Sequence, residues 1–377
     1  MKRYDAIVLG VGGVGSAALY HLARRGLRVL GIDRFSPGHA RGSSHGGTRI
    51  IRQAYFEHAD YVPLVLRAWE LWTELAERRG EPMFAEVGLL QVGSPQGDVV
   101  KGVLASARQH ALEVEELAAA DIVRRWPGFY AADELVGAYE RRAGYLHVER
   151  CVLAHVAEAV AAGAELVCDR AVLSWRGDGS GVVLTTDREE LRADRLVLTA
   201  GPWSANLLAD FAVRLEVLRK PVFWLATRDG SYRADRGCPC FLYELPSGIF
   251  YGIPQLDDRG AKVAEHTGGQ TVFDPLNVDR ALRADDREQV ARFAAAHLPR
   301  ATDTVTDHSV CMYTMTPDGH FIVDHHPTFP QVIVIAGLSG HGFKFASVLG
   351  EVAADLAIDG TTTLPIDFLR IGRFHDR

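Results

Sequence analysis

The stretch Tyr4–Gly15, YDAIVLGVGGVG, decides the fold of this chain. Its residues 6–9 form a short apolar run, which is typical of a buried parallel strand. The glycines that follow match the pattern G-x-G-x-x-G. In that pattern the first glycine permits a tight turn, the second lets a pyrophosphate approach the backbone, and the third lets a helix pack on the strand. The stretch therefore predicts a dinucleotide-binding turn between a strand and a helix.

The residues that follow complete the unit. Residues 16–25 read as the helix, whose N-terminus favours a phosphate group, and Gly26 is a plausible C-cap. Residues 29–32 form a second strand, and Asp33 at its end is placed to accept a hydrogen bond from a ribose hydroxyl. The alternative is a glycine-rich turn that binds nothing. The turn does not say which dinucleotide is bound.

Length and composition set wider limits. A chain of 377 residues is long enough for two domains of about 150 residues each. A net charge of −7 without a basic run argues against a general nucleic-acid binder. No apolar stretch approaches the ~20 residues of a membrane span, and no secretory signal is visible. The five scattered cysteines make a poor disulfide framework, which favours the cytoplasm. Cys238 and Cys240 are too close for a usual zinc pair, so no metal site is expected.

Strand and helix patterns alternate along the chain in a way that predicts a mixed α/β protein with discontinuous domains. A second strand with a glycine turn occurs at 196–203, with a helix expected onward to Phe211, and a third occurs at 332–344. Strand-rich segments lie between these units, and residues 84–93 are predicted as one strand. We expect a Rossmann-like dinucleotide-binding domain of residues 1–84, 145–214 and 320–377. Residues 85–144 and 215–319 would form a substrate domain built on a mainly antiparallel sheet.

Several blocks of sequence identify a family. They are Gly42–Tyr55, Gly248–Pro254, Lys262–Gln270, Val310–Thr314 and Ser339–Phe345. Through these blocks the chain resembles, over nearly its whole length, the monomeric sarcosine oxidase and N-methyltryptophan oxidase family of FAD-dependent amine oxidases.

The resemblance implies that the dinucleotide is FAD and that Cys311 is bonded covalently to the flavin ring. Such a bond would fix the ring and raise its reduction potential. The alternative for Cys311 is a buried strand cysteine that acts as a small hydrophobe. The positions expected to contact FAD are Gly10, Val11, Gly12, Gly13, Val14, Gly15, Asp33, Arg34, Ser43, Ser44, Thr48, Arg49, Val172, Ala200, Gly201, Trp203, Cys311, Gly340, Gly342, Phe343 and Lys344.

The implied reaction oxidises a secondary amine at the carbon beside nitrogen, with O2 as acceptor, and gives H2O2 and an aldehyde. A substrate carboxylate in an apolar pocket needs a cationic partner, and the resemblance assigns this role to Arg52 and Lys344. The residues expected to line the substrate cleft, or to pack on ring or substrate, are Tyr251, His266, Leu242 and Tyr313. The alternatives are ordinary surface charges and a satisfied core histidine.

A fixed positive charge beside the flavin would stabilise the anion that develops as O2 is reduced. The resemblance places Lys262 there, with Arg49 and His45 on the other side of the ring. The alternative for Lys262 is a surface lysine at a strand end.

The chain departs from the usual family pattern at Ser44 and Gly47, which replace a histidine and an aspartate. The run 338–351 is closer to the N-methyltryptophan type, so substrate size stays open between sarcosine, N-methyltryptophan and cyclic amino acids such as pipecolate or proline. Two other functions also stay open, namely a dehydrogenase that passes electrons to a carrier protein and a non-catalytic nucleotide-binding module. The family suggests a monomer.

Overall fold

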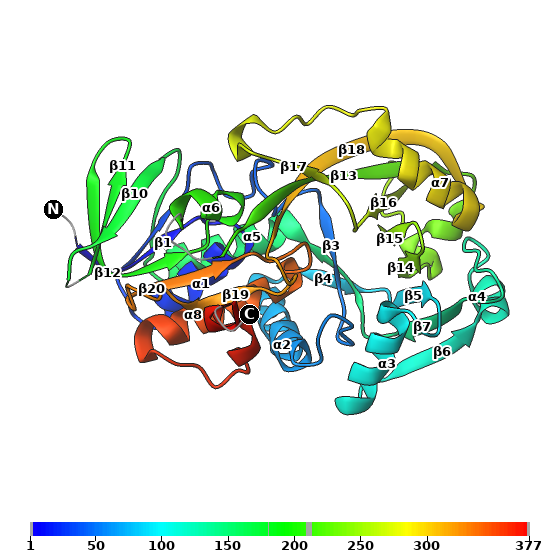
Figure 1. Ribbon diagram of the computed structural model, residues 1–377, viewed down its shortest axis with the longest axis horizontal. Coiled ribbons are helices and arrows are strands. Elements are labelled where there is room, and N and C mark those ends of the chain that lie inside the picture. Colours follow the sequence, from blue (N-terminus) through cyan, green and yellow to red (C-terminus); the bar gives the residue numbers. More distant parts are fainter. Residues whose placement is uncertain (1–2, 180, 209–212, 375–377) are drawn as a thin grey trace.

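The computed structural model describes residues 3–179, 181–208 and 213–374. Within these residues the strands form two large sheets and one small sheet, and the large sheets occupy opposite ends of an elongated molecule (Figure 1). No helix among these residues is long and apolar enough to cross a membrane. The five cysteines are free thiols.

The first large sheet has a parallel centre, in which β1 lies between β12 and β2. β20 extends it beside β12, and β9 extends it beside β2. The antiparallel strands β10, β11 and β19 complete its edges. The strands are β1 (Arg3–Leu9), β2 (Val29–Ile32), β9 (Glu165–Val167), β10 (Val172–Gly177), β11 (Val182–Thr186), β12 (Glu190–Leu198), β19 (Ile322–His325) and β20 (Val332–Ala336).

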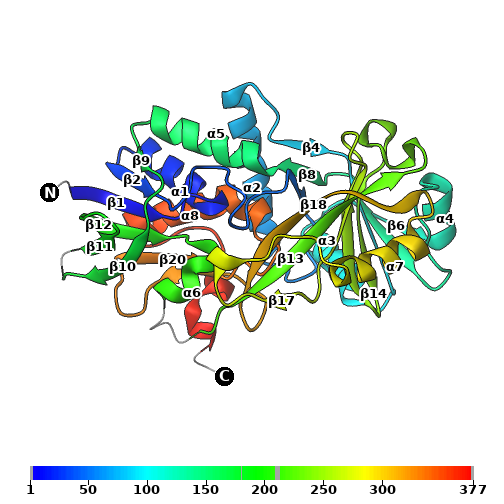
Figure 2. The same cartoon turned by 90° about the horizontal axis from the view of Figure 1, so that it is seen from above.

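Helices pack on this sheet around α1, which contacts both α8 and α5 (Figure 2). Two glycines explain the close approach. A Cβ on Gly15 would lie 1.8 Å from the carbonyl oxygen of Gly10, and one on Gly350 would lie 2.4 Å from the Cβ of Ala17. The third glycine of the motif is therefore required for packing of α1 on β1. The helices are α1 (Gly13–Arg24), α2 (Tyr61–Arg79), α5 (Val148–Ala161) and α8 (Ala346–Asp359).

The second large sheet is mainly antiparallel and has the order β17-β13-β16-β15-β14-β5-β7-β6, with β18 paired to β13. One pair, β14 with β5, is parallel. Its strands are β5 (Leu89–Gly93), β6 (Val114–Ala118), β7 (Val136–Glu140), β13 (Glu216–Thr227), β14 (Cys240–Leu245), β15 (Gly248–Ile253), β16 (Ala261–Glu265), β17 (Gln270–Thr271) and β18 (Ala301–Met315). The helices of this end are α3 (Asp98–Gln109), α4 (Ala119–Arg125) and α7 (Glu288–His297). The expected mixed α/β class is confirmed, and the division into two domains stays a prediction.

The small sheet joins the two ends and consists of β3 (Thr48–Ile51), β8 (Gly144–His147) and β4 (Phe84–Glu86). The prediction of one strand over 84–93 is therefore wrong, because β4 and β5 belong to different sheets. Gly88 separates them with a φ of +81°, and a Cβ there would lie 2.4 Å from the Tyr139 hydroxyl oxygen. The helix predicted to run to Phe211 is described only as α6 (Ser204–Leu207), since residues 209–212 lie outside the described residues.

Candidate active site

A cavity of about 390 Å³ lies where the carboxyl ends of β1, β12 and β20 meet the second sheet. Most of the predicted site residues line it. They are Gly10, Val11, Gly12, Gly13, Val14, Asp33, Arg34, Ser43, Ser44, Arg49, Arg52, Val172, Ala200, Gly201, Trp203, Leu242, Tyr251, His266, Tyr313, Gly340, Gly342, Phe343 and Lys344. Gly15, His45, Thr48, Lys262 and Cys311 lie behind this lining. Residues 300 positions apart in sequence are thus brought to one site.

Two side chains fix the position of the glycine turn, which lines the cavity. The Asp33 carboxylate accepts hydrogen bonds from the backbone N–H groups of Val11 (2.6 Å) and Phe35 (2.9 Å). The Ser44 hydroxyl accepts one from Gly13 N–H (3.0 Å). Ser44, one of the departures from the family pattern, therefore has a structural role in fixing the turn. The predicted ribose contact of Asp33 remains a prediction.

Two buried polar atoms on the cavity wall fit a bound dinucleotide. Trp203 Nε1 and Thr314 Oγ1 have no hydrogen-bond partner within the described part of the chain, and both residues line the cavity. A buried donor without a partner costs about 1–3 kcal/mol, so such groups normally serve a ligand or a water molecule. Together with the glycine turn at the N-terminus of α1, they fit the phosphates and hydroxyls of FAD.

Cys311 lies on β18 and is in contact with Arg49 of β3. Arg49 Nη2 donates to the sulfur at 3.0 Å, while its other bonds go to the carbonyls of Thr48 (2.8 Å) and Ser43 (3.1 Å). Burial raises the pKa of the Cys311 thiol, but Arg49, His45 and Lys262 outweigh it and lower that pKa to about 6. A low thiol pKa marks a reactive cysteine rather than an inert core residue.

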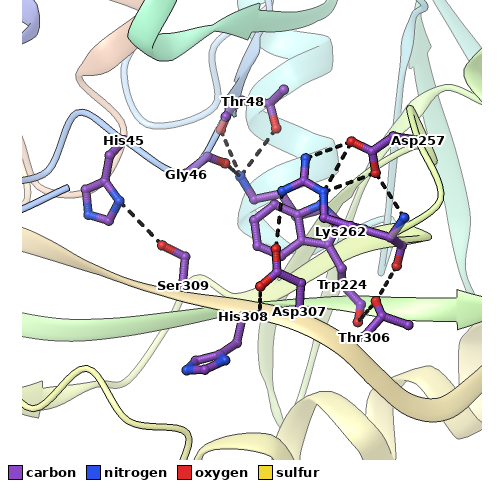
Figure 3. A network of polar contacts seen from close by, with 12 residues as sticks. His45, Gly46, Thr48, Trp224, Asp257, Lys262, Thr306, Asp307, His308 and Ser309 are labelled. Atoms are coloured by element: carbon purple, nitrogen blue, oxygen red, sulfur yellow. Dashed lines mark hydrogen bonds and ion pairs between the residues drawn. The ribbon is translucent and has the colours of Figure 1, made fainter. Parts of the chain in front are cut away.

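Lys262 lies on β16, and only 2% of its surface is exposed. Its ammonium donates to the carbonyls of Gly46 (2.7 Å) and Thr48 (3.0 Å) and to the Thr48 hydroxyl (3.3 Å; Figure 3). Burial, reinforced by Arg49, lowers the pKa of Lys262 to about 7. The surface-lysine alternative is therefore wrong. Glu149 was not predicted; its carboxylate accepts from Gly46 N–H at 2.7 Å and also from Gly47 N–H.

His45 lies in the same region but does not line the cavity. Its Nδ1 is 3.4 Å from the Ser309 hydroxyl (Figure 3). Its carbonyl oxygen is 3.8 Å from the sulfur of Cys311. The predicted contact of His45 with the ring remains a prediction.

Arg52 and Lys344 both line the cavity and both lie against the Tyr55 ring, and they are 3% and 6% exposed. Arg52 pairs with Glu57 at 2.6 Å and lies over the Tyr55 ring, 4.0 Å from its centroid. Lys344 Nζ donates to the carbonyl of His341 at 2.8 Å. Burial and Arg52 lower the pKa of Lys344 to about 7, although Glu57 opposes them. Both residues are buried, so the surface-charge alternative is wrong here too.

Glu57 was missed by the sequence analysis. Burial raises the pKa of its carboxyl, but Arg52 and its other cationic neighbours outweigh burial and lower that pKa to about 2. The only signal in the sequence is that Glu57 lies five residues after Arg52. An exposed acid in an ordinary loop can have the same spacing, so the signal does not single out Glu57.

Tyr251, His266 and Tyr313 line the cavity with their rings. The ring centroids of His266 and Tyr313 are 5.6 Å apart, and those of Tyr251 and His266 are 6.5 Å apart. Burial lowers the pKa of His266 to about 4, so this imidazole is neutral near pH 7. Leu242 adds an apolar wall on β14, beside Tyr251 in the neighbouring strand. The wall suits the hydrocarbon part of a small amine.

Comparison with known proteins now gives the family. Residues 5–356 match the family of FAD dependent oxidoreductases. Monomeric sarcosine oxidase from Streptomyces avermitilis is 40% identical over 96% of both chains. N-methyl-L-tryptophan oxidase from Citrobacter koseri is 37% identical over 99% of both.

Solved structures agree on the fold. The amino acid oxidase NikD superposes with a TM-score of 0.86 at 24% identity, covering 98% of both chains. Glycine oxidase from Geobacillus kaustophilus gives a TM-score of 0.80 at 22% identity, covering 98% of this chain and 99% of that one. The resemblance seen in the sequence is confirmed: the chain belongs to the family of FAD-dependent oxidoreductases and is a relative of monomeric sarcosine oxidase and N-methyl-L-tryptophan oxidase.

Proposed function

We propose that this enzyme is an oxidase of N-methyl amino acids such as sarcosine, with O2 as the electron acceptor. The observation that carries the proposal is the buried pair Arg52 and Lys344 at one end of the cavity. Two cations in an apolar wall are the partners that a substrate carboxylate requires. In the overall reaction, the amine, O2 and water give the demethylated amino acid, formaldehyde and H2O2. The amine loses two electrons and O2 gains them.

FAD, when bound, accepts the two electrons from the carbon beside the amine nitrogen and passes them to O2. The protein binds FAD and the substrate and orients them. Gly10, Gly12 and Gly13 would receive the phosphates at the N-terminus of α1. Cys311, held as a thiolate by Arg49, would anchor the ring through a C–S bond that replaces a C–H bond of the flavin, with the proton released to water and the two electrons taken up by O2. Lys262 would supply the charge that favours O2 reduction.

The substrate would lie with its carboxylate on Arg52 and Lys344. Its amine would point toward Tyr251 and His266, where the neutral imidazole accepts a hydrogen bond without adding a repelling charge. Arg52 is already ion-paired with Glu57, so a substrate carboxylate must share Arg52 with Glu57 or displace the Glu57 carboxylate. Sarcosine is the first candidate, and N-methyltryptophan and cyclic amino acids are the further candidates.

A substrate panel with peroxide detection tests the activity. We expect H2O2 and formaldehyde from sarcosine in equal amounts, with N-methyltryptophan, pipecolate and proline compared under the same conditions. If an artificial dye is reduced but no peroxide forms, the enzyme is a dehydrogenase. If no amine is oxidised, the oxidase proposal is wrong.

Acid precipitation tests the covalent link. The wild-type precipitate should stay yellow, whereas Cys311→Ser should release FAD to the supernatant; Cys151→Ser, a change of another buried cysteine outside the cavity, is the matched control. Colour in the supernatant of the wild type would exclude Cys311 as the anchor. A cytoplasmic monomer is the expected form, which fractionation and light scattering can check.

A further inference from the structure

The buried Lys262 ammonium has no direct carboxylate partner in the described part of the chain. Its hydrogen bonds go to two carbonyls and one hydroxyl, and it makes no ion pair with a carboxylate among residues 3–179, 181–208 and 213–374. The groups that act on it electrostatically are Arg49, Cys311, Glu149 and Arg259. An isolated buried ammonium is costly unless its surroundings hold it in place. The groups that separate Lys262 from solvent therefore decide how well its charge is held.

Trp224 covers Lys262 on its outer side. The two residues are direct partners across β13 and β16, and Lys262 Nζ lies 5.1 Å from the centroid of the indole (Figure 3). Arg259 also lies over this indole, with Cζ at 4.6 Å from the centroid. The Arg259 side chain is 45% exposed, whereas Trp224 is 6% and Lys262 is 2% exposed. A surface guanidinium and a buried ammonium therefore pack on the same indole.

The surface side of this arrangement is itself fixed. Arg259 pairs with Asp257 at 2.7 Å and with Asp307 at 3.3 Å. The Thr306 hydroxyl donates to the carbonyl of Trp224 at 3.1 Å and also contacts the carbonyl of Arg259. Asp257 and Arg259 precede β16, while Thr306 and Asp307 lie on β18. These contacts fix the position of Arg259, which packs on the indole. None of these residues lines the cavity.

We propose that Trp224, with Arg259 seated on the same indole, is the wall that positions Lys262 and shields it from bulk water while reduced FAD reacts with O2. This inference rests on the proposed oxidase function, because it names Trp224 as a positioning residue for Lys262. Trp224 does not line the cavity and contacts neither FAD nor substrate in this assignment.

Two consequences follow from the geometry. Removal of the indole admits water, which weakens the burial effect that lowers the pKa of Lys262, so this pKa rises. The lysine side chain also gains freedom to leave Gly46 and Thr48, so its charge is held less well beside the ring. Loss of Arg259 removes a nearby positive charge and raises the pKa of Lys262 in the same direction, but by less.

The experiment uses the FAD-loaded enzyme with Trp224→Phe, Trp224→Leu and Arg259→Gln. Trp126 provides a matched control, because it is 9% exposed, carries Arg125 at 4.4 Å and lies outside the cavity. Its variants are Trp126→Phe, Trp126→Leu and Arg125→Gln. Each enzyme is reduced with dithionite and mixed with oxygenated buffer, so that reoxidation is measured without any amine.

A second readout does not depend on activity. The chain has only five lysines, at positions 2, 101, 220, 262 and 344. Lysine labelled with 13C at Cε gives few NMR signals, and Lys262→Met assigns the signal of Lys262. The pH titration of this signal then reports the proton affinity of Lys262 directly.

Below pH 7, where Lys262 is charged in wild type and variants alike, we expect Trp224→Leu to slow reoxidation about tenfold because the charge is held less well beside the ring. The NMR midpoint of Lys262 should move upward, toward the ~10.4 of a free lysine. Trp224→Phe should retain most of the rate, and Arg259→Gln should give a smaller upward shift. The Trp126 and Arg125 variants should match the wild type. If Trp224→Leu fails to fold, the test rests on the NMR midpoint of Lys262 in Trp224→Phe and Arg259→Gln, compared with their control variants.

The outcomes separate the two proposals. If Lys262→Met reoxidises slowly but the Trp224 and Arg259 variants behave like their Trp126 and Arg125 controls, only the wall is wrong. If Lys262→Met reoxidises at the wild-type rate, the oxygen role of Lys262 fails and the wall loses its function with it.

Discussion

The two cationic clusters of the cavity use the same residue types with different companions. Arg52 and Lys344 have a carboxylate beside them, Glu57, at 2.6 Å from Arg52. Arg49 and Lys262 have a thiol and backbone carbonyls, with Cys311 at 3.0 Å from Arg49. A cluster that already holds a carboxylate can exchange it for that of a ligand. In the other cluster the anion is the Cys311 thiolate. If its sulfur is bonded to the flavin, as proposed, Arg49 and Lys262 keep positive charge for the negative charge that develops during a reaction. The companions, rather than the cations, are therefore the basis on which we propose that the two clusters serve different half-reactions.

The largest effect should come from the end that holds the carboxylate. Arg52→Met removes a buried, hydrogen-bonded charge, and such losses cost about 2–5 kcal/mol, so kcat/KM for sarcosine should fall on the order of 1,000-fold. Steady-state kinetics checks this. Arg67→Met, which breaks the pair with Glu351 outside the cavity, should leave kcat/KM unchanged. A similar loss in both variants would point to general damage.

The other end should respond to O2 rather than to the amine. Lys262→Met should lower kcat/KM for O2 on the order of 100-fold, because a fixed charge near developing negative charge is lost. Oxygen-electrode assays at varied O2 check this, with Lys101→Met on the exposed surface as the control. An unchanged O2 dependence would remove the contrast between the two clusters.

The pH dependence of ligand binding tests the state of Lys344. Because burial lowers the pKa of Lys344 to about 7, this residue is charged below pH 7 and loses its charge as the pH rises through that value. The Kd of a carboxylate inhibitor should therefore rise about tenfold above the midpoint, since a charged hydrogen bond is lost. Titration by flavin absorbance in wild type and in Lys344→Met checks this. A rise of equal size in Lys344→Met would assign the transition to another group.

The smallest effect should come from Glu57. Glu57→Gln removes the carboxylate that competes for Arg52, so a carboxylate inhibitor should bind about threefold more tightly. Glu70→Gln, an exposed acid on α2, serves as the control in the same titration. Weaker binding in Glu57→Gln would mean that Glu57 positions Arg52 rather than competes for it.

Local pattern was sufficient for the elements that carry their own signals. The strand, glycine turn and helix at Tyr4–Arg24 are predictable because glycine spacing, apolar runs and the acid at Asp33 all act within 30 residues. The amphipathic pattern of residues 61–79 likewise predicts a helix, which is observed as α2 with the same bounds. The break at Gly88 was not, because it depends on β4 and β5 pairing with different distant strands.

The site shows the same limit. Resemblance supplied the residues that the cavity brings together, but the acids that support them carry no local signal. Glu140 is an example, since it is buried and accepts hydrogen bonds from the backbone N–H groups of Gln53 (2.5 Å) and Ala54 (3.2 Å) directly after Arg52. In the sequence Glu140 is followed by two arginines. This local pattern is equally typical of an exposed strand end, so it does not predict burial. Only the tertiary contact shows that it holds the chain beside Arg52.

The most direct test measures both half-reactions by rapid mixing in the same two variants. Arg52→Met should slow anaerobic flavin reduction by sarcosine and leave reoxidation by O2 at the wild-type rate. Lys262→Met should show the opposite pattern. If each variant slows both half-reactions to the same extent, the two clusters do not serve separate steps and the account is wrong.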